Sequence, residues 1–497
     1  MEDLGRLRLR RRRRLPAFSV PRSGFRTGDG GKLGRLFRLV AVRPCRERRA
    51  WQDWMESLRP TWSMQAVDRA HMNTIKQHGL KPVESNLEER PAVEIETFGT
   101  TSGDRGPGAE RATVVVSIGI LAYNEESSIA GTIESILEQS IVTRPPAGWQ
   151  VEIVCVPNGC TDGTAEVAGE SLKAMSAETD EPAVTAKVTS IAKPSKHNAW
   201  NEFVHRLSRR DATHLVLMDG DVRLVGRRTL ESMIRTLIED PYAHVCGATT
   251  VKHNETGGHQ GMLGRISLGA TRLRRNQSER SGQAGFAGCL YACPVESCRR
   301  MVLPEVLVGE DSFLRAVWAT NFFTVPIASS DERRVVSSPD ARVMFEAYLR
   351  PSSVLKNLRR RMVGLTINSM LYDRLWATSS SEADAGELLH RWNREDPDWD
   401  RRLIAERIAE RGSWVVPGGS FGRWLISRRG LWRWFDRMRG MSLSKKACMM
   451  PVAMVGTVLH AYACISANRL IRSGRLEGLW FTTKTTLAPS NNAVIGG

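Results

Sequence analysis

The stretch HLVLMDGDVRL, residues 214–224, ends a largely apolar run with two carboxylates, Asp219 and Asp221, which only Gly220 separates. A short apolar run bounded by a turn signal is typical of a buried β-strand. Two carboxylates this close repel each other, so the pair is costly unless a positive charge lies between or beside them. The stretch therefore predicts a buried strand that ends at a charged site.

Segments suited to strands and segments suited to helices alternate around this stretch. Alternation at this spacing predicts an α/β fold, namely a doubly wound domain with a mostly parallel sheet. The predicted strands are 113–123, 151–156, 183–191 and 214–218, and the predicted helices begin after Ser127 or Ser128 and cover 161–175, 197–207 and 228–240.

Polar residues directly follow three of the four predicted strands. In doubly wound sheets, ligands bind beyond the carboxyl ends of the strands, so these residues are expected to converge on one edge. Carboxylate oxygens suit a hard divalent cation such as Mg²⁺ or Mn²⁺, which would bridge the two aspartates and a diphosphate. The converging residues are Tyr123, Asn124, Glu125, Asn158, Asp219 and Asp221.

Charge is distributed unevenly along the 497 residues, whose net charge is +17. The first 50 residues hold fifteen Arg, one Lys and four acids. Such a segment cannot bury a core, so residues 1–110 are expected to form a basic, disordered arm and linker, or to lie partly upstream of the true start. Residues 111–345 are the predicted α/β domain, and residues 346–497 are the predicted helical C-terminal region.

The nine cysteines are scattered, their number is odd, and none occurs in a CxxC pair or at zinc-finger spacing. This pattern predicts free thiols in a reducing compartment.

The C-terminal region is rich in Arg and Trp. Its uncharged stretch 447–466 reaches transmembrane length but contains Pro451 and His460, so a buried or membrane-surface helix is expected rather than a spanning one. The tryptophans suit either an interface with lipid or ordinary helix packing. We expect peripheral contact with the inner, cytoplasmic face of a membrane and no nucleic-acid partner. The tryptophans in question are Trp414, Trp424, Trp432, Trp434 and Trp480.

Four motifs together resemble the family 2 glycosyltransferases, which have the GT-A fold. They occur in the family's order and approximate spacing, and the resemblance covers roughly residues 113–345. It implies an inverting transfer of a sugar from a nucleotide-activated donor, usually UDP-linked, with a divalent metal. The motifs are VVVSIGILAYNEESSIAGTIESIL (114–137), VPNGCTDGTAEVA (156–168), HLVLMDGDVRL (214–224) and VGEDSFL (308–314).

The resemblance assigns roles to the polar edge residue by residue. The turn Ala122, Tyr123, Asn124 and Glu125 resembles the segment that holds the nucleotide base and ribose. Asn158 stands where the family more often has an aspartate that contacts the base or ribose, and Asp162 is better explained as a turn and helix-capping residue.

The resemblance also implies donor contacts in two other segments of the chain. Lys193 and Lys196, with Asn198 and Asn201, resemble a loop and helix that approach the donor, although a solvated face is the alternative. Asp219 and Asp221 resemble the ribose and metal pair, with Asp221 the better metal ligand.

The resemblance also assigns the base. Asp311 matches the carboxylate that deprotonates the acceptor hydroxyl, and Glu310 would orient it or the acceptor. Both acids also suit the start of a helix. The Gly-rich segment 285–294 resembles an acceptor loop. The Q-x-x-R-W signature of polysaccharide synthases is missing. Arg359, Arg360 and Arg361 in the comparable region could still reach a diphosphate, but they better suit an exposed helix face.

The sequence therefore predicts an inverting glycosyltransferase that adds a single sugar to a glycan or lipid-linked acceptor. A nucleotidyltransferase would carry a Gly-rich, basic turn after the first strand, where this chain has the acidic AYNEESS. The alternative from another class is a degenerate glycosyltransferase domain that binds glycan or membrane without turnover.

Overall fold

The computed structural model describes residues 114–178, 183–252, 286–325, 332–345, 351–380, 382–417, 422, 442–474 and 476. The basic arm and linker expected over residues 1–110 lie outside this part of the chain, and so do the tryptophans Trp424, Trp432, Trp434 and Trp480.

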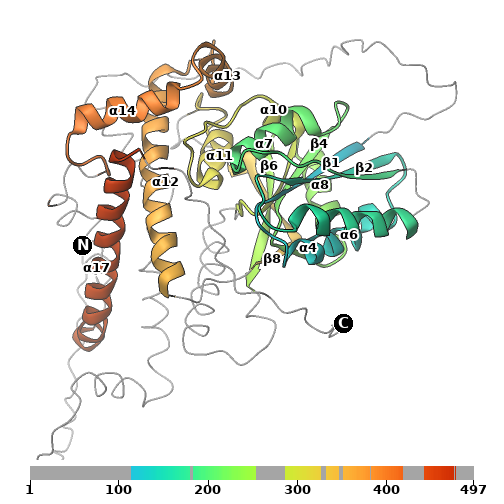
Figure 1. Cartoon of the computed structure of the whole chain (residues 1–497), viewed down its shortest axis with the longest axis horizontal. Coiled ribbons are helices and arrows are strands. Elements are labelled where there is room, and N and C mark those ends of the chain that lie inside the picture. The colour runs from blue at the N-terminus through green and yellow to red at the C-terminus, as the bar shows by residue number, and fades with distance from the viewer. Residues whose placement is uncertain are drawn as a thin grey trace, which may run out of the picture. The chain divides into compact units, whose positions relative to one another are not determined.

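An eight-stranded mixed sheet forms the centre of the α/β domain, in the order β3-β2-β1-β4-β7-β6-β8-β5 (Figure 1). The first four strands in this order are mutually parallel. β7 is antiparallel to both neighbours, β8 is parallel to β6, and β5 is antiparallel to β8. The predicted α/β class is thus confirmed, and the strands are β1 (Val114–Ala122), β2 (Trp149–Pro157), β3 (Val184–Val188), β4 (His214–Asp219), β5 (Arg223–Val225), β6 (Val245–Lys252), β7 (Leu290–Pro294) and β8 (Val335–Phe345).

Alternate residues of the central strands pack on opposite faces of the sheet, as the two-residue period of a strand requires. On β2, Ile153 and Cys155 belong to one buried cluster, and Val154 and Val156 belong to the other. Every residue of β1 is buried, so this strand is covered on both faces. Its continuous apolar run explains why the sequence alone located it.

Helices cover both faces of this sheet. The cluster around Ile153 includes buried residues of α4 and α8, and the cluster around Val154 includes buried residues of α7 and α11. The helix predicted over 197–207 is α7 followed by a wider π-helical turn, Phe203–Leu207. The helices of this domain are α4 (Ile129–Leu137), α5 (Ser140–Thr143), α6 (Thr164–Glu178), α7 (Lys196–Glu202), α8 (Thr229–Glu239), α10 (Val295–Arg299) and α11 (Glu310–Ala319).

The C-terminal region is helical, as predicted, and it shares a core with the α/β domain. Tyr372 Oη donates to the carbonyl of Ser312 at 2.9 Å. A Cβ on Gly364 would lie 2.1 Å from the carbonyl oxygen of Val308, so a glycine is needed at this close approach. The helices are α12 (Pro351–Thr378), α13 (Ala385–Glu395), α14 (Trp399–Arg411) and α17 (Leu443–Arg472).

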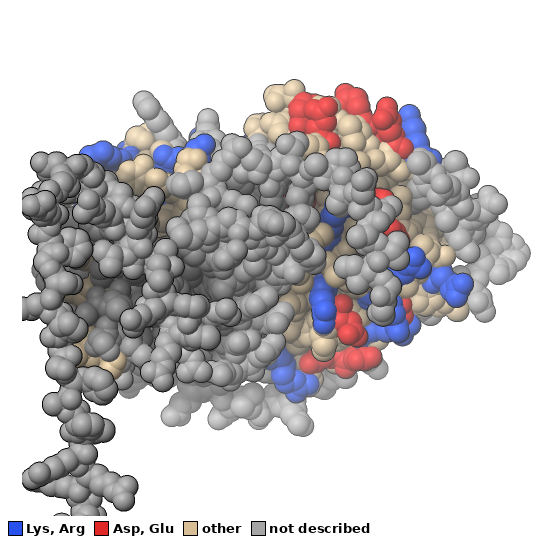
Figure 2. All heavy atoms as spheres, turned by 90° about the horizontal axis from the view of Figure 1, so that it is seen from below, with Lys and Arg blue, Asp and Glu red and all other residues tan. Residues whose placement is uncertain are grey.

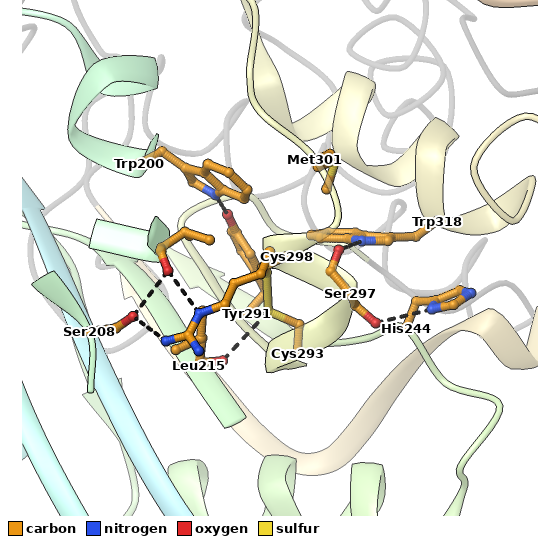
Figure 3. Close-up of a disulfide and its surroundings, with 12 residues drawn as sticks. Trp200, Ser208, Leu215, His244, Tyr291, Cys293, Ser297, Cys298, Met301 and Trp318 are labelled. Carbon is orange, nitrogen blue, oxygen red and sulfur yellow. Dashed lines mark hydrogen bonds between the residues drawn. A yellow bond between two sulfur atoms is a disulfide. The ribbon is translucent and has the colours of Figure 1, made fainter. Parts of the chain in front are cut away.

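A disulfide between Cys293 and Cys298 joins β7 to α10 (Figure 3). The prediction of free thiols is therefore wrong for this pair. Nearby, Trp200 Nε1 donates to Tyr291 Oη at 2.8 Å, and Trp318 Nε1 donates to the Ser297 carbonyl at 3.0 Å. Cys155, Cys160, Cys246 and Cys289 take no part in a disulfide.

The described surface carries charges of both signs. In Figure 2, acidic and basic side chains lie near one another over the described part of the face shown. This distribution agrees with a sequence whose basic excess lies mainly in its first 50 residues.

Candidate functional site

The carboxyl ends of β1, β2 and β4 meet at one edge of the sheet. In the strand register, Leu121 pairs with Asp219 and Ala122 pairs with Pro157. The backbone N–H of Asn158 donates to the Ala122 carbonyl at 2.9 Å, and that of Gly220 donates to the Leu121 carbonyl at 3.0 Å. The structure thus brings together the three polar segments that follow these strands.

The turn after β1 is held by its own side chains. Asn124 has φ 52°, in the left-handed region that Asn tolerates better than most residues, and its Oδ1 accepts from the Thr161 N–H at 2.8 Å. Glu125 is buried, its N–H donates to Thr164 Oγ1 at 2.8 Å, and its Oε2 accepts from Ser128 Oγ at 2.8 Å. Tyr123 is partly exposed at the end of the strand.

The Ser128 hydroxyl does not cap α4, although Ser128 occupies the N-cap position. It donates instead to Glu125 and, at 3.4 Å, to the Gly220 carbonyl. The serine expected to cap the helix therefore links the first turn of the site to the DGD segment.

Asn158 is almost fully buried, and its Nδ2 donates to the Ala122 carbonyl at 2.6 Å. An ionised aspartate could not make this bond because it has no hydrogen to donate. The asparagine at this position therefore has a structural reason that the sequence did not reveal. Asp162 accepts from the N–H groups of Glu126 and Thr164, each at 3.2 Å, which agrees with the turn and capping role expected for it.

Gly220 lies against the chain's own backbone. A Cβ there would lie 2.9 Å from the Cβ of Ala122, closer than side chains normally pack. Its carbonyl accepts from Thr132 Oγ1 at 3.0 Å. In the described structure the close approach permitted by this glycine is therefore to Ala122.

Lys196 is the positive charge beside the aspartate pair. Its Nζ lies 2.5 Å from Asp219 Oδ1 and 2.6 Å from Glu310 Oε1, and its side chain is only 8% exposed. Lys196 opens α7, where Ser195 Oγ accepts from the Asn198 N–H at 3.2 Å. One buried ammonium group thus joins the DGD and GED segments, which are far apart in the sequence. We call Lys196, His197, Asp219 and Glu310 the buried cluster, in which Asp219, with a side chain that is 25% exposed, is the least buried member.

The pKa values of the buried cluster depend on one another. Burial alone would lower the pKa of Lys196. The charges of Asp219 and Glu310 raise this pKa by more than burial lowers it, so it lies well above its ordinary value. Burial raises the pKa of Glu310, yet Lys196, His197 and Arg360 outweigh this effect and lower it to about 2. Glu310 and Lys196 therefore form a charged pair at neutral pH.

Asp219 and His197 are the members of the buried cluster whose charged forms are less well stabilised. Burial raises the pKa of Asp219 to about 6, against the effect of Lys196, and the charges of Asp221 and Glu310 add to the increase. Burial lowers the pKa of His197 to about 4. The His197 Nε2 lies 4.0 Å from Glu310 Oε2 and makes no hydrogen bond within the described part of the chain.

Of the remaining acids of the two motifs, Asp221 is partly exposed and Asp311 is exposed, and we call these two the open rim. Asp311 is exposed, and its Oδ1 accepts from the Ser312 N–H at 2.8 Å. Gly288 packs directly on it, because a Cβ there would lie 2.4 Å from Asp311 Cβ. Two neighbouring acids thus lie in different environments, although both are in the first turn of α11.

Gly309 positions these two acids. It precedes α11 with φ 77°, in the left-handed region that favours glycine. The acids therefore begin a helix, as the simpler interpretation of the sequence expected, and the same helix directs Glu310 into the buried cluster.

The donor set fits a divalent cation. Burial and the nearby charge of Asp221 raise the pKa of Asp219, so this part of the site has excess negative charge that a cation would reduce. Within the described ranges, no three His, Cys, Asp or Glu side chains are grouped to hold a metal. Asp219 and Asp221 are the carboxylates of this edge that could hold such a cation, and a diphosphate and water could supply the other oxygens.

Several sequence-based interpretations change with the structure. Lys193 is exposed and pairs with Glu305, unlike Lys196. Asn201 donates through Nδ2 to the Leu303 carbonyl at 3.0 Å, so its role is structural. Leu290–Pro294 is the core strand β7, so only the beginning of the segment 285–294 can be a loop.

The sequence reasoning missed His197 and Arg360. His197 gave no signal beyond its position next to Lys196. Arg360 was expected on an exposed helix face with Arg359 and Arg361, but it is partly buried and its charge lowers the pKa of both Glu310 and His197.

Comparison with known families supports the resemblance seen in the motifs. Residues 117–303 match the model of Glycosyl transferase family 2. The matched segment runs from β1 to the loop after α10 and includes the DGD sequence, whereas Glu310 and Asp311 lie beyond its end. The resemblance to family 2 glycosyltransferases is thereby confirmed for this segment. No curated protein sequence matches the chain.

Two solved structures illustrate the similarity. A mannosyltransferase from Pyrobaculum calidifontis, in complex with GDP-Man and Mn²⁺, is 17% identical over 86% of this chain and 99% of its own, with a TM-score of 0.41. Glucosyl-3-phosphoglycerate synthase from Mycobacterium tuberculosis, in complex with Mn²⁺, UDP and phosphoglyceric acid, is 16% identical over 52% of this chain and 79% of its own, with a TM-score of 0.33.

Proposed function

We propose that this protein is a metal-dependent, inverting glycosyltransferase that moves one sugar from a nucleotide-sugar, usually a UDP-sugar in the family, to a glycan or lipid-linked acceptor. The observation that carries the proposal is the position of Lys196, within 2.6 Å of both Asp219 and Glu310. This contact brings the DGD segment (219–221) and the GED segment (309–311) together in one site. A binding protein without turnover would not need the second of these motifs.

The donor would bind at the edge formed by the turn after β1, Asn158 and Asp219. Tyr123 is partly exposed there, and the fixed backbone of Asn124 and Glu125 offers a preformed surface for the base and ribose. Asp219 and Asp221 would hold Mg²⁺ or Mn²⁺. The metal, when bound, neutralises the charge that builds up on the leaving diphosphate.

Lys196 would support the site from its buried position. Its ammonium group is buried, permanently charged at neutral pH and tied to both motifs, so it holds Asp219 and Glu310 in fixed positions. Preorganised charges of this kind stabilise a developing anion without reorganising during the reaction. Glu310 is therefore a positioning residue in this mechanism.

Asp311 would be the general base. It is exposed and adjoins Gly288, whereas Glu310 is committed to Lys196 and its pKa of about 2 makes it a weak proton acceptor. Asp311 would take the proton from the acceptor hydroxyl as that oxygen attacks the anomeric carbon. Attack opposite the leaving nucleotide inverts the configuration at that carbon.

The proposal is tested by measuring the release of nucleoside diphosphate from UDP-, GDP- and dTDP-sugars, with Mn²⁺ or with EDTA. We expect one donor to be turned over in the presence of metal, with the activity abolished in Asp221→Ala. Asp340→Ala, an exposed acid on β8, is the matched control and should retain activity. Saturable donor binding without turnover with any acceptor would instead support the degenerate binding domain, and no binding would refute both.

A further inference from the structure

The helix α17 has an apolar outer face. Six large apolar side chains on it are between 42% and 83% exposed. At 3.6 residues per turn, they lie within an arc of roughly 140° around the helix. We call these residues the outer stripe: Leu443, Met450, Met454, Val455, Val458 and Tyr462.

The opposite face of α17 is the one that packs on the protein, and apart from Ile471 its buried residues are small or polar. Gly456, Ala463, Cys464 and Ala467 are buried there, and α17 runs against α12 (Figure 1). Asn468 fixes this face, because its Oδ1 accepts from the Val415 N–H at 2.8 Å. The helix therefore directs the six large apolar groups of the outer stripe away from the protein. This is the reverse of an ordinary surface helix, whose apolar side faces the core.

The surrounding sequence is basic. Arg469 and Arg472 are exposed and, by helical periodicity, continue the outer stripe at its C-terminal end. Over residues 421–474 the chain carries ten Arg and Lys and a single acid, Asp436. An apolar helix face combined with a cluster of Lys and Arg is the pattern of a helix that lies in the interface of an anionic membrane.

None of the helices that the structure describes combines the length and the apolar character needed to cross a membrane. A second copy of this chain is the less favourable partner, because it would bring two basic regions of the same sign together.

We propose that α17 is a membrane-docking helix that lays its outer stripe into the surface of an anionic lipid bilayer, with the neighbouring Arg and Lys contacting the headgroups. The apolar side chains would leave water for the boundary of the acyl chains, and the basic residues would supply the preference for negative charge. This proposal does not depend on the proposed transferase activity, since it rests on the exposure and charge of the helix alone.

The test is co-sedimentation of the full chain with vesicles of phosphatidylcholine alone, or with about a third of phosphatidylserine. We expect binding to the anionic vesicles that weakens at high salt. The double variant Met454→Glu/Val458→Glu should bind at least about tenfold more weakly, because it places two acids in the stripe. The matched control Ile238→Glu/Tyr242→Glu makes the same change at exposed apolar positions outside α17 and should bind as the wild type does.

Circular dichroism and thermal unfolding of both double variants show whether they fold. The proposal is overturned if the wild-type protein does not bind anionic vesicles, or if a folded α17 variant binds them as well as the control does. It is also overturned if light scattering shows that the α17 variant breaks a dimer while vesicle binding stays unchanged, since the stripe would then be a contact between copies of the chain.

Discussion

In the buried cluster, Lys196 lies within 2.6 Å of two carboxylates that are largely shielded from water, whereas in the open rim Asp311 is exposed and next to a glycine. The two regions are neighbours, and Glu310 and Asp311 are consecutive residues of the same helix turn. The difference lies in what each charge faces. A buried charge must be paired, while an exposed one remains available to a ligand. The buried cluster therefore holds the site in place, whereas the residues of the open rim would act in the reaction.

The substitution Asp311→Asn tests the role of the open rim. We expect turnover to fall by about 10²–10⁴-fold, because the amide cannot accept the proton of the acceptor hydroxyl. The free energy of unfolding should change by less than about 0.5 kcal/mol, since Asn can still accept from the Ser312 N–H. Diphosphate release and urea unfolding measure the two effects. Full turnover in this variant would mean that the base is another residue.

The second substitution is Lys196→Met, which removes the cation shared by Asp219 and Glu310. Asp219 and Glu310 would then lose the cation that lies between them, so we expect the free energy of unfolding to fall by about 3–5 kcal/mol. Lys193→Met is the matched control, because Lys193 is exposed and its pair with Glu305 lies in solvent. It should cost less than about 1 kcal/mol. Equal losses in the two variants in urea unfolding would contradict the central role of Lys196.

The third prediction concerns pH and sharpens the description of the buried cluster. Burial lowers the pKa of His197 to about 4, below the value of about 6.5 expected in the unfolded chain. Between these values the unfolded state binds more protons, so this contribution to stability is fully present above about pH 6.5 and is lost as the pH falls towards 4.

Its measurement compares urea unfolding at pH 7 and pH 4.5. The wild type should lose roughly 2–3 kcal/mol more than His197→Gln over this interval, because the variant lacks the titrating group. His390→Gln makes the same substitution at a partly exposed position outside the buried cluster and serves as the control. If His197→Gln showed the same pH dependence as the wild type, the ring would not be held neutral by burial.

Much of the α/β half of the fold was predictable because its strands are continuous apolar runs. β1, β2 and β4 were located from composition alone, and so were the polar residues at their carboxyl ends. The strands β5 to β8 were missed. β5 has only three residues, and β8 alternates buried and exposed positions irregularly, so neither carries a clear local signal.

The sequence by itself determined which residues lie at the functional edge, because the carboxyl ends of parallel strands must meet. It located Asp219 and Asp221 in this way, and the resemblance to family 2 glycosyltransferases located Glu310 and Asp311. Only the tertiary structure decided the environment of each acid: Glu310 is buried against Lys196, whereas Asp311 is exposed. Burial and charge pairing depend on segments distant in the chain, and no local pattern of residues encodes the distance between them.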